Sequence, residues 1–200
     1  MSEARIGRVL VASLHQAIAD ELPMRLEFYE NWLNASGLRE GTIGLAPLSA
    51  VLSFLRGEGD AYNQITAKAG RYAADWTVST MPPLRRRMLQ MLPAPLRVRM
   101  ALRTAGGLVR ATYPGSRAIV RLKRGTASVE LRGSLFCEVR EASVLPLCGF
   151  YAAAIARVLE QFALRADARV DECRAAGGRK GCLLVVVVHS GAGAGRPEAA

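Results

Sequence analysis

Four cysteines are the residues of this chain whose chemistry is easiest to name. They are Cys137, Cys148, Cys173 and Cys182, and no other cysteine occurs in the chain. Thiolates are good zinc ligands, and three or four that converge can form a tetrahedral site. The spacing lacks the close CxxC pairs of a zinc finger, and free cysteines are often buried as small apolar side chains. A zinc site and a set of core cysteines therefore both remain open.

Two predicted elements decide whether these thiols can meet. Cys173 and Cys182 flank the segment RAAGGRKG, which indicates a glycine-rich turn between two strands. Cys148 lies just before an alanine-rich segment, residues 150–162, whose pattern predicts a helix. If this helix packs beside the turn, Cys148 can fold back onto the other two cysteines.

The remaining elements follow from the spacing of apolar residues. A spacing of three and four predicts helices over residues 6–20, 23–33, 47–56 and 60–78. Two short arginine-rich helices are expected next, separated by Pro93 and Pro95. The period changes at Gly106-Gly107, and strands are expected over residues 108–113, 118–123, 127–131, 168–172 and 182–189. The last of these contains the run LLVVVV, which suits a central strand.

The order of the elements predicts the fold class. Helices that come first and strands that come later indicate an α+β fold, with N-terminal helices packed on a mainly antiparallel sheet and one long helix before the final strand pair. We expect a single domain over residues 1–189, with a helical part (1–105) and a sheet-rich core (106–189). The low-complexity tail, 190–200, is expected to be disordered. No signal peptide or membrane-spanning run is visible, which indicates a cytoplasmic protein with reduced thiols.

The positive charge is concentrated in one segment. The net charge is +10, and no Asp or Glu occurs between Asp75 and Glu130. Eleven of the 27 basic residues lie in that interval, so the rest of the chain is close to neutral. Such asymmetry indicates an anionic partner for this segment. One interpretation is that Arg85 to Arg103 contact an anionic membrane surface, and the other is that these arginines are simply solvated. A nucleic acid is not expected, because no aromatics are interleaved and no nucleic-acid-binding motif is visible.

The C-terminal half resembles a known family. The segment SLFCEVREASVLPLCGFYAAAIARVLEQFALRADARVDECRAAGGRKGCLLVVVV is similar to the 4-vinyl reductase domain, with a cysteine before a small-residue helix and a cysteine-flanked glycine turn before an apolar strand. The resemblance covers residues 108–189. That family belongs to a superfamily shared with trafficking-particle subunits and heme–NO-binding-like domains. Phe136-Cys137 and the GFY at 149–151 most resemble the bacteriochlorophyll 4-vinyl reductase branch.

The resemblance implies a metal site. Cys148, Cys173 and Cys182 match cysteines that hold zinc in several members of the family. The glutamate that the family often places three residues before the first hairpin cysteine is replaced by Val170. Cys137, Glu172 or a water molecule is therefore left as the fourth ligand.

The resemblance also implies a ligand and a pathway. It suggests a bacteriochlorophyll biosynthesis protein that acts at the 4-vinyl (8-vinyl) reduction step and binds a tetrapyrrole. Such an apolar plate suits a pocket lined by Tyr72, Trp76 and Tyr151, with Arg103 and Arg110 for its carboxylate. The same aromatic residues at helical spacing are more often core residues.

A reductase needs a hydride donor, and no nicotinamide or flavin motif is visible, which favours a carrier or accessory factor over an enzyme. The alternatives are a sensory or regulatory module for another small hydrophobic effector and a protein–protein assembly subunit. A homodimer and a position beside the inner or photosynthetic membrane also remain open.

Overall fold

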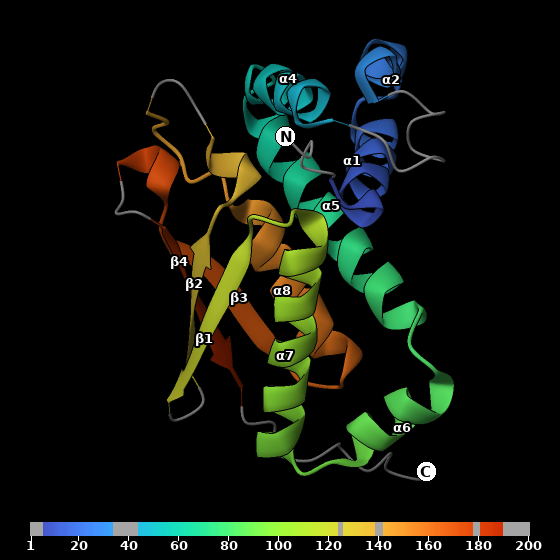
Figure 1. Cartoon of the computed structure of the whole chain (residues 1–200), viewed down its shortest axis with the longest axis vertical. Helices are drawn as coiled ribbons and strands as arrows, with labels where there is room; N and C mark the ends of the chain where they lie inside the picture. The colour runs from blue at the N-terminus through green and yellow to red at the C-terminus, as the bar shows by residue number, and fades with distance from the viewer. Residues whose placement is uncertain (1–5, 34–43, 124–125, 139–141, 178–180, 190–200) are drawn as a thin grey trace, which may run out of the picture.

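The fold is an antiparallel sheet covered by helices. The structure is a computed structural model that describes residues 6–33, 44–123, 126–138, 142–177 and 181–189. Within these ranges the chain forms one four-stranded sheet with its helices gathered on one side, which confirms the predicted α+β class (Figure 1). The tail expected to be disordered, 190–200, lies outside the described residues. None of the helices described is long and apolar enough to cross a membrane.

The helices occupy the first half of the chain and one later segment. The α-helices are α1 (Arg8–Glu21), α2 (Leu26–Leu33), α4 (Leu45–Arg56), α5 (Asp60–Ser79), α6 (Pro83–Met91), α7 (Ala94–Thr112) and α8 (Gly149–Gln161). Short 3-10 turns are η1 (Pro23–Arg25), η2 (Leu135–Cys137) and η3 (Arg174–Ala176). The strands are β1 (Arg117–Lys123), β2 (Thr126–Arg132), β3 (Ala166–Glu172) and β4 (Cys182–Val188).

The sheet has the order β1-β2-β4-β3, and every neighbouring pair is antiparallel. The apolar run of β4 is therefore central, as predicted. Residues on β2 and β4 alternate in burial because successive side chains point to opposite faces. The inward-facing positions are Ala127, Val129, Leu131, Cys182, Leu184 and Val186.

Helices cover the inward face of this sheet in layers. α8 packs against β3 and α7 against β1, while α5 lies on the far side of α8 and α1 packs on α5 (Figure 1). Gly70 sits where α5 meets α8, and a Cβ atom there would overlap the backbone oxygen of Phe150. The missing side chain therefore allows the two helices to approach closely.

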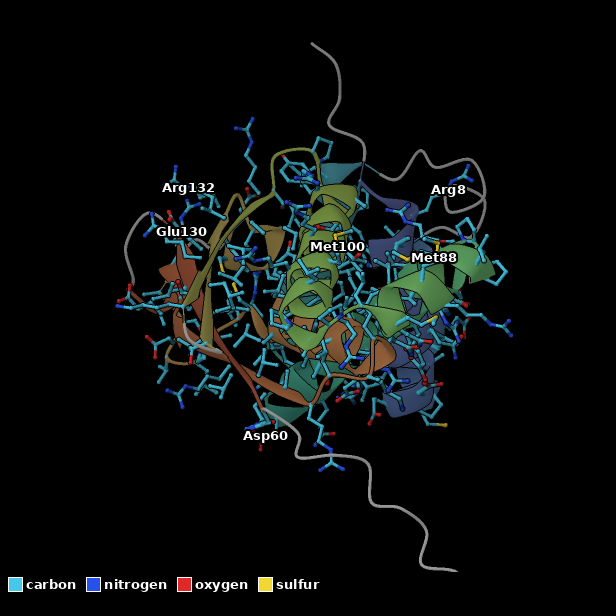
Figure 2. All side chains as sticks on the ribbon, turned by 90° about the horizontal axis from the view of Figure 1, so that it is seen from below. Arg8, Asp60, Met88, Met100, Glu130 and Arg132 are labelled. Carbon is cyan, nitrogen blue, oxygen red and sulfur yellow. The ribbon has the colours of Figure 1, made fainter. Side chains whose placement is uncertain are left out.

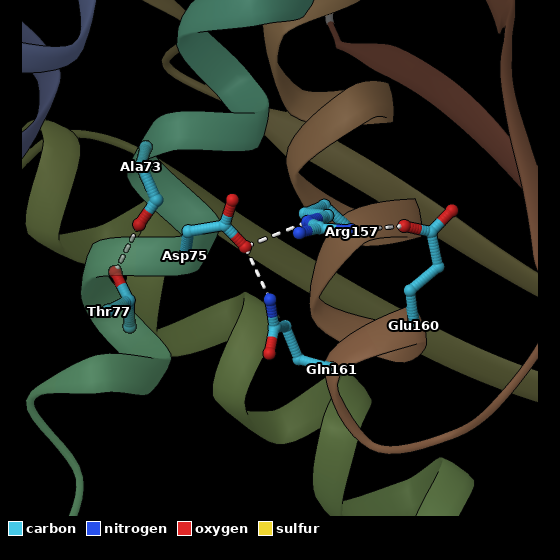
Figure 3. Close-up of polar contacts among 6 residues, drawn as sticks. All are labelled: Ala73, Asp75, Thr77, Arg157, Glu160 and Gln161. Carbon is cyan, nitrogen blue, oxygen red and sulfur yellow. Dashed lines mark hydrogen bonds and ion pairs between the residues drawn. The ribbon is translucent and has the colours of Figure 1, made fainter.

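A polar contact supplements this apolar contact between α5 and α8. Arg157 Nε donates to Asp75 Oδ1 at 2.7 Å, and Gln161 Nε2 donates to the same oxygen at 2.5 Å (Figure 3). Arg157 also contacts Glu160 at 3.0 Å. About a third of each side chain in the Asp75–Arg157 pair remains exposed. Solvent screens such a pair, so its role is to orient the helices more than to stabilise them.

One predicted strand is wrong. Residues 108–113 were expected to form a strand after a break at Gly106-Gly107, but α7 continues without interruption to Thr112. The second arginine-rich helix is therefore long, not short. Its helical spacing persists through the glycines, because Ala105, Leu108 and Thr112 are all buried on the same helix.

Candidate metal centre and ligand cavities

The four cysteines meet at one point in the core. Their sulfur atoms all lie within 4.8 Å of one another, and all four residues are buried. Cys137 Sγ is 2.9 Å from Cys148 Sγ, 3.4 Å from Cys173 Sγ and 3.3 Å from Cys182 Sγ. These separations are too long for disulfide bonds, whose sulfurs lie about 2.05 Å apart.

Each sulfur comes from a different element. Cys137 ends η2, Cys148 directly precedes α8, Cys173 directly follows β3, and Cys182 begins β4. The antiparallel pairing of β3 with β4 brings the last two together, and the pairing of Cys182 with Leu131 on β2 places them near the segment that follows β2. The sheet register therefore assembles the cluster.

The N-terminal helices hold the two remaining segments in place. Arg56 on α4 donates to the backbone oxygen of Phe136 at 3.1 Å, beside Cys137. Tyr62 on α5 donates to the backbone oxygen of Leu147 at 3.1 Å, beside Cys148. Both contacts cross from the helical part to the cysteine cluster, so the cluster also joins the two parts of the chain.

Hydrogen-bond donors around the cluster favour ionised sulfur. The backbone N–H of Leu147 lies 3.4 Å from Cys173 Sγ, and that of Arg174 lies 3.4 Å from Cys182 Sγ. These two thiols have a lowered pKa, chiefly because the thiol of Cys137 and then that of Cys148 donate to them. The pKa of Cys148 is raised, first by its contact with Cys137.

The fourth thiol, Cys137, balances opposing contacts. The hydrogen bond with Cys148 lowers its pKa, but the contacts with Cys173 and Cys182, together with burial, outweigh that effect and raise it. Four buried thiolates repel one another and lose their hydration, so all four can ionise only around a cation.

The donor set fits a single tetrahedral ion. Four sulfurs at about 2.3 Å from zinc would lie roughly 3.8 Å apart. The sulfur of Cys137 lies 2.9–3.4 Å from the other three, so zinc would fit after the sulfurs move apart by less than 1 Å. Cys137 occupies the fourth position, whereas Glu172 is exposed at the end of β3. Spacing alone could not decide between these two residues, because the segment that follows β2 carries no motif that fixes its path.

Two cavities flank α7, away from the cysteines. One, of about 500 Å³, lies between α7 and β1 and is lined by Arg99, Leu102, Arg103, Gly106, Arg110, Ala118, Val120 and Leu122. The other, of about 350 Å³, is lined by Thr77, Met81, Arg85, Met100, Arg103, Thr104, Gly107, Leu108 and Ala111. We call them the sheet-side cavity and the helix-side cavity.

The two glycines of α7 face these cavities. Gly106 lines the sheet-side cavity and Gly107 the helix-side cavity. A Cβ atom added to either glycine would meet no atom within 4 Å. A glycine inside a helix costs about 1 kcal/mol relative to alanine. Packing within the chain therefore does not require a glycine at either position. A ligand that approaches the helix backbone closely would require one.

The predicted ligand-binding residues fall in different places. Arg103 and Arg110 both line the sheet-side cavity. Tyr72 and Trp76 stack on each other with ring centroids 5.9 Å apart, and the Tyr72 hydroxyl donates to Asp20 on α1. Tyr151 is completely buried, and burial raises its pKa to about 12. None of these three aromatic residues lines either cavity.

Each of the two histidines pairs with a carboxylate outside the two cavities. His15 Nε2 lies 2.8 Å from Glu30, and His189 Nε2 lies 2.6 Å from Asp167. Neither histidine lines the sheet-side or the helix-side cavity. Sequence reasoning missed Gly106, Gly107 and Arg99 as cavity residues, although two adjacent glycines inside an otherwise regular helical pattern were a visible signal.

Sequence comparisons give no relative, because neither a family model nor a curated protein matches the chain. Solved structures do match. An H-NOX protein from K. algicida in the Fe(II) unliganded state aligns with a TM-score of 0.57 at 13% identity, over 93% of this chain and 98% of that one. An H-NOX domain from Shewanella oneidensis in the Fe(II)CO state aligns with a TM-score of 0.55 at 12% identity, over 93% and 99%.

A second kind of protein has a similar structure. Subunit 3 of a trafficking protein particle complex from Naegleria fowleri, covalently bound to palmitic acid, aligns with a TM-score of 0.50 at 12% identity, over 90% of this chain and 96% of that one. The chain therefore shares an α+β fold with H-NOX domains and trafficking-particle subunits. At 12–13% identity this likeness is one of fold.

Proposed function

We propose that this chain is a small-molecule-binding domain whose ligand is an apolar molecule with an anionic group. The sheet-side cavity is the observation that carries the proposal. Its volume of about 500 Å³ lies within the roughly 300–1,000 Å³ typical of ligand sites. Its floor is apolar, formed by Leu102, Ala118 and Val120, and Gly106 leaves the helix backbone open to the ligand.

Three arginines give this cavity its charge preference. Arg99, Arg103 and Arg110 line it from α7, and no carboxylate is among its lining residues. No ion pair with a carboxylate involves these three residues in the described part of the chain. Guanidinium groups bind carboxylates and phosphates through paired hydrogen bonds. An apolar ligand with one carboxylate or phosphate group can pack on the apolar side chains of the cavity and bind its arginines.

The cysteine cluster is proposed as a structural zinc site. Four protein sulfurs leave no open position on a tetrahedral ion, so substrate has no place to bind there. Zinc would fix the start of α8 and the turn between β3 and β4 to the segment that follows β2. Its contribution is to hold these segments in register rather than to supply chemistry.

A tetrapyrrole intermediate at the 4-vinyl reduction step is the specific ligand that we propose first. Support comes from the resemblance of residues 108–189 to the 4-vinyl reductase domain and from the combination of an apolar floor with arginines that suits a carboxylated macrocycle. A hydride donor would have to come from another protein, which favours the role of carrier.

A sensory module for another hydrophobic effector is the second candidate. The favouring observation is the shared fold with H-NOX domains described as Fe(II)CO-ligated and with a subunit described as palmitate-bound. Both candidates use the same cavity, and they differ in which ligand fills it. A subunit that acts only through protein contacts would need no cavity at all.

Binding measurements with two probes separate these roles. Purified protein is mixed with divinyl chlorophyllide or with palmitate, and binding is followed by the pigment's absorption and by equilibrium dialysis. We expect the pigment to bind with a Kd that rises about tenfold or more in an Arg103→Gln variant, because a desolvated charge-assisted hydrogen bond is worth about 1.5–3 kcal/mol. Arg169→Gln, which changes an exposed arginine on β3, is the matched control.

The outcomes distinguish the candidates. Pigment binding without turnover in the presence of NADPH supports the carrier, whereas turnover by the protein alone makes it a reductase. Binding of palmitate and not of the pigment supports an effector-binding module. No binding of either probe to zinc-loaded protein would contradict the proposed ligand class.

A further inference from the structure

The short helix α6 has an unusual environment. Of its nine residues only Leu89 is buried, and only Gln90 is partly buried. In two perpendicular views α6 lies at the edge of the molecule opposite the sheet, with Met88 on this edge and Glu130 and Arg132 on the other (Figures 1 and 2). The helix therefore presents most of its surface outward.

The exposed surface of α6 is amphipathic. Leu84, Met88 and Met91 are spaced by four and three residues, so they form one stripe along the helix. They are 71%, 62% and 85% exposed, respectively. The buried Leu89 lies about 130° around the helix from the centre of this stripe, given 100° per residue. The stripe thus points away from the protein core.

Basic side chains border this apolar stripe. At 100° per residue, Arg87 lies about 70° from the centre of the stripe on one side and Arg85 about 90° on the other, whereas Arg86 lies on the opposite side of the helix. Arg85 and Arg87 are exposed, and neither has a side-chain partner among the residues that the structure describes. Arg85 also lines the helix-side cavity. No carboxylate occurs between Asp75 and Glu130, so no neighbour in sequence neutralises these charges. Leu96, in the first turn of α7, is also 46% exposed.

We propose that α6 is a docking element for the surface of a phospholipid bilayer that contains anionic lipids. An interfacial helix needs an apolar stripe that enters the acyl boundary and cations that reach the headgroups, and α6 presents both on its free side. The charge pattern selects this occupant, because an apolar protein groove would not require the flanking arginines. This inference does not depend on the cavities, the zinc site or the proposed ligand.

Position links this surface to the rest of the molecule. Pro82 directly precedes α6 and Pro83 is its first residue, while Pro93 directly precedes α7 and Pro95 lies in its first turn. These prolines separate α6 from α5 and from α7. The chain after α6 enters α7, which lines both cavities. A protein docked through α6 would therefore hold its cavities near the bilayer surface, where apolar anions partition.

The test uses the full-length, zinc-loaded chain and two kinds of vesicle. Sedimentation is measured with phosphatidylcholine vesicles and with vesicles of three parts phosphatidylcholine to one part phosphatidylglycerol. We expect binding to the anionic vesicles that weakens with salt, and little binding to the neutral ones. The Arg85→Gln/Arg87→Gln variant should bind roughly 25-fold more weakly, about fivefold for each cation removed from the surface.

The apolar stripe is tested separately. The Leu84→Ser/Met88→Ser/Met91→Ser variant should lose roughly tenfold or more in partitioning, because three buried apolar side chains are lost from the interface. Arg165→Gln/Arg169→Gln and Met24→Ser are the matched controls, since they remove two exposed arginines and one exposed methionine elsewhere. All variants change exposed residues, and circular dichroism checks that each one folds.

Three results would overturn the proposal. The first is vesicle binding that the α6 variants leave unchanged, or equal binding to neutral vesicles. The second is self-association, measured by sedimentation equilibrium, that disappears in the serine variant, because the stripe would then be covered by a second copy. The third is salt-sensitive binding to duplex DNA through Arg85 and Arg87 with no binding to vesicles.

Discussion

Single thiols control the proposed zinc site. Cys137→Ser replaces one sulfur of the cluster with a weaker ligand while keeping the side chain small. We expect wild-type protein to carry one zinc per chain by metal analysis and the variant to carry much less. Ser134→Ala is the control, since its hydroxyl lies 3.6 Å from Cys148 Sγ but is not one of the four ligands. Iron instead of zinc would be revealed by the visible colour of iron–thiolate sites, and wild-type protein free of any metal would leave only buried core cysteines.

A side chain added to the middle of α7 should separate folding from ligand binding. Gly106→Leu places an apolar side chain in the sheet-side cavity, where a Cβ atom meets no protein atom. We expect the thermal stability to be kept or raised, because leucine has a helix propensity close to 1 kcal/mol better than that of glycine. Binding of the ligand should be lost, as measured by equilibrium dialysis. Unchanged binding would mean that the ligand does not enter this cavity.

At the scale of single residues, the sequence singled out candidate residues but predicted less well which of them lie together in space. Cys148, Cys173 and Cys182 were found because they flank recognisable elements, whereas Cys137 lies in an irregular segment with no pattern of its own. Arg103 and Arg110 were singled out by their charge, but Ala118 and Val120, which line the same cavity, come from the strand β1. Which strand faces α7 depends on sheet order, which local spacing does not encode.

The contact between α5 and α8 depends on one glycine. Gly70→Ala should destabilise the protein, because the added Cβ atom would overlap the Phe150 carbonyl and force the helices apart. The loss should be about 1–3 kcal/mol, the usual cost of overpacking, and should exceed the gain in helix propensity. Urea unfolding measures it. Gly106→Ala is the control and should stabilise by up to about 1 kcal/mol, since it meets open space. A neutral or stabilising effect of Gly70→Ala would contradict this packing.

Elements were predicted well where apolar spacing was continuous. The spacing of Leu48, Val51, Leu52 and Leu55 places α4 correctly, and all four residues are buried. The error came at Gly106-Gly107, which resembled a turn. A glycine inside a helix costs only about 1 kcal/mol of stability relative to alanine. The burial of Val98, Leu102 and Val109 on the same helix outweighs this cost. The tertiary contacts that settle this balance are not visible in a local window.

Removal of the metal should loosen one part of the molecule more than the rest. Zinc at a hundredfold excess over its Kd would contribute about 2.7 kcal/mol, so chelation should lower the Tm by roughly 5–11 °C. Hydrogen exchange should rise most at η2, the start of α8 and η3, which carry or adjoin the cysteines. Exchange in α1 and the middle of α5 should change least. A uniform rise across the chain would show that the site supports global stability only.

The whole-molecule architecture was accessible from sequence because its two halves differ in period. Helical spacing dominates before the first strand and alternation after it, so the α+β class needed no knowledge of contacts. The layering of α8 between the sheet and α5 was not accessible. It depends on which faces fit together, and at Gly70 that fit is decided by the backbone of a helix far along the chain.

The packing of α5 on α8 has a consequence for how the protein is made. α5 ends at Ser79, and its partner α8 begins only at Gly149. At a translation rate of about 5–20 residues per second, the intervening chain takes roughly 4–14 s to synthesise. During this interval the side of α5 that contains Gly70 and Ala74 is exposed, because α8, which packs against it, has not yet been synthesised. Nascent chains should therefore be most dependent on chaperones in this interval, before the fourth cysteine, Cys182, has been translated.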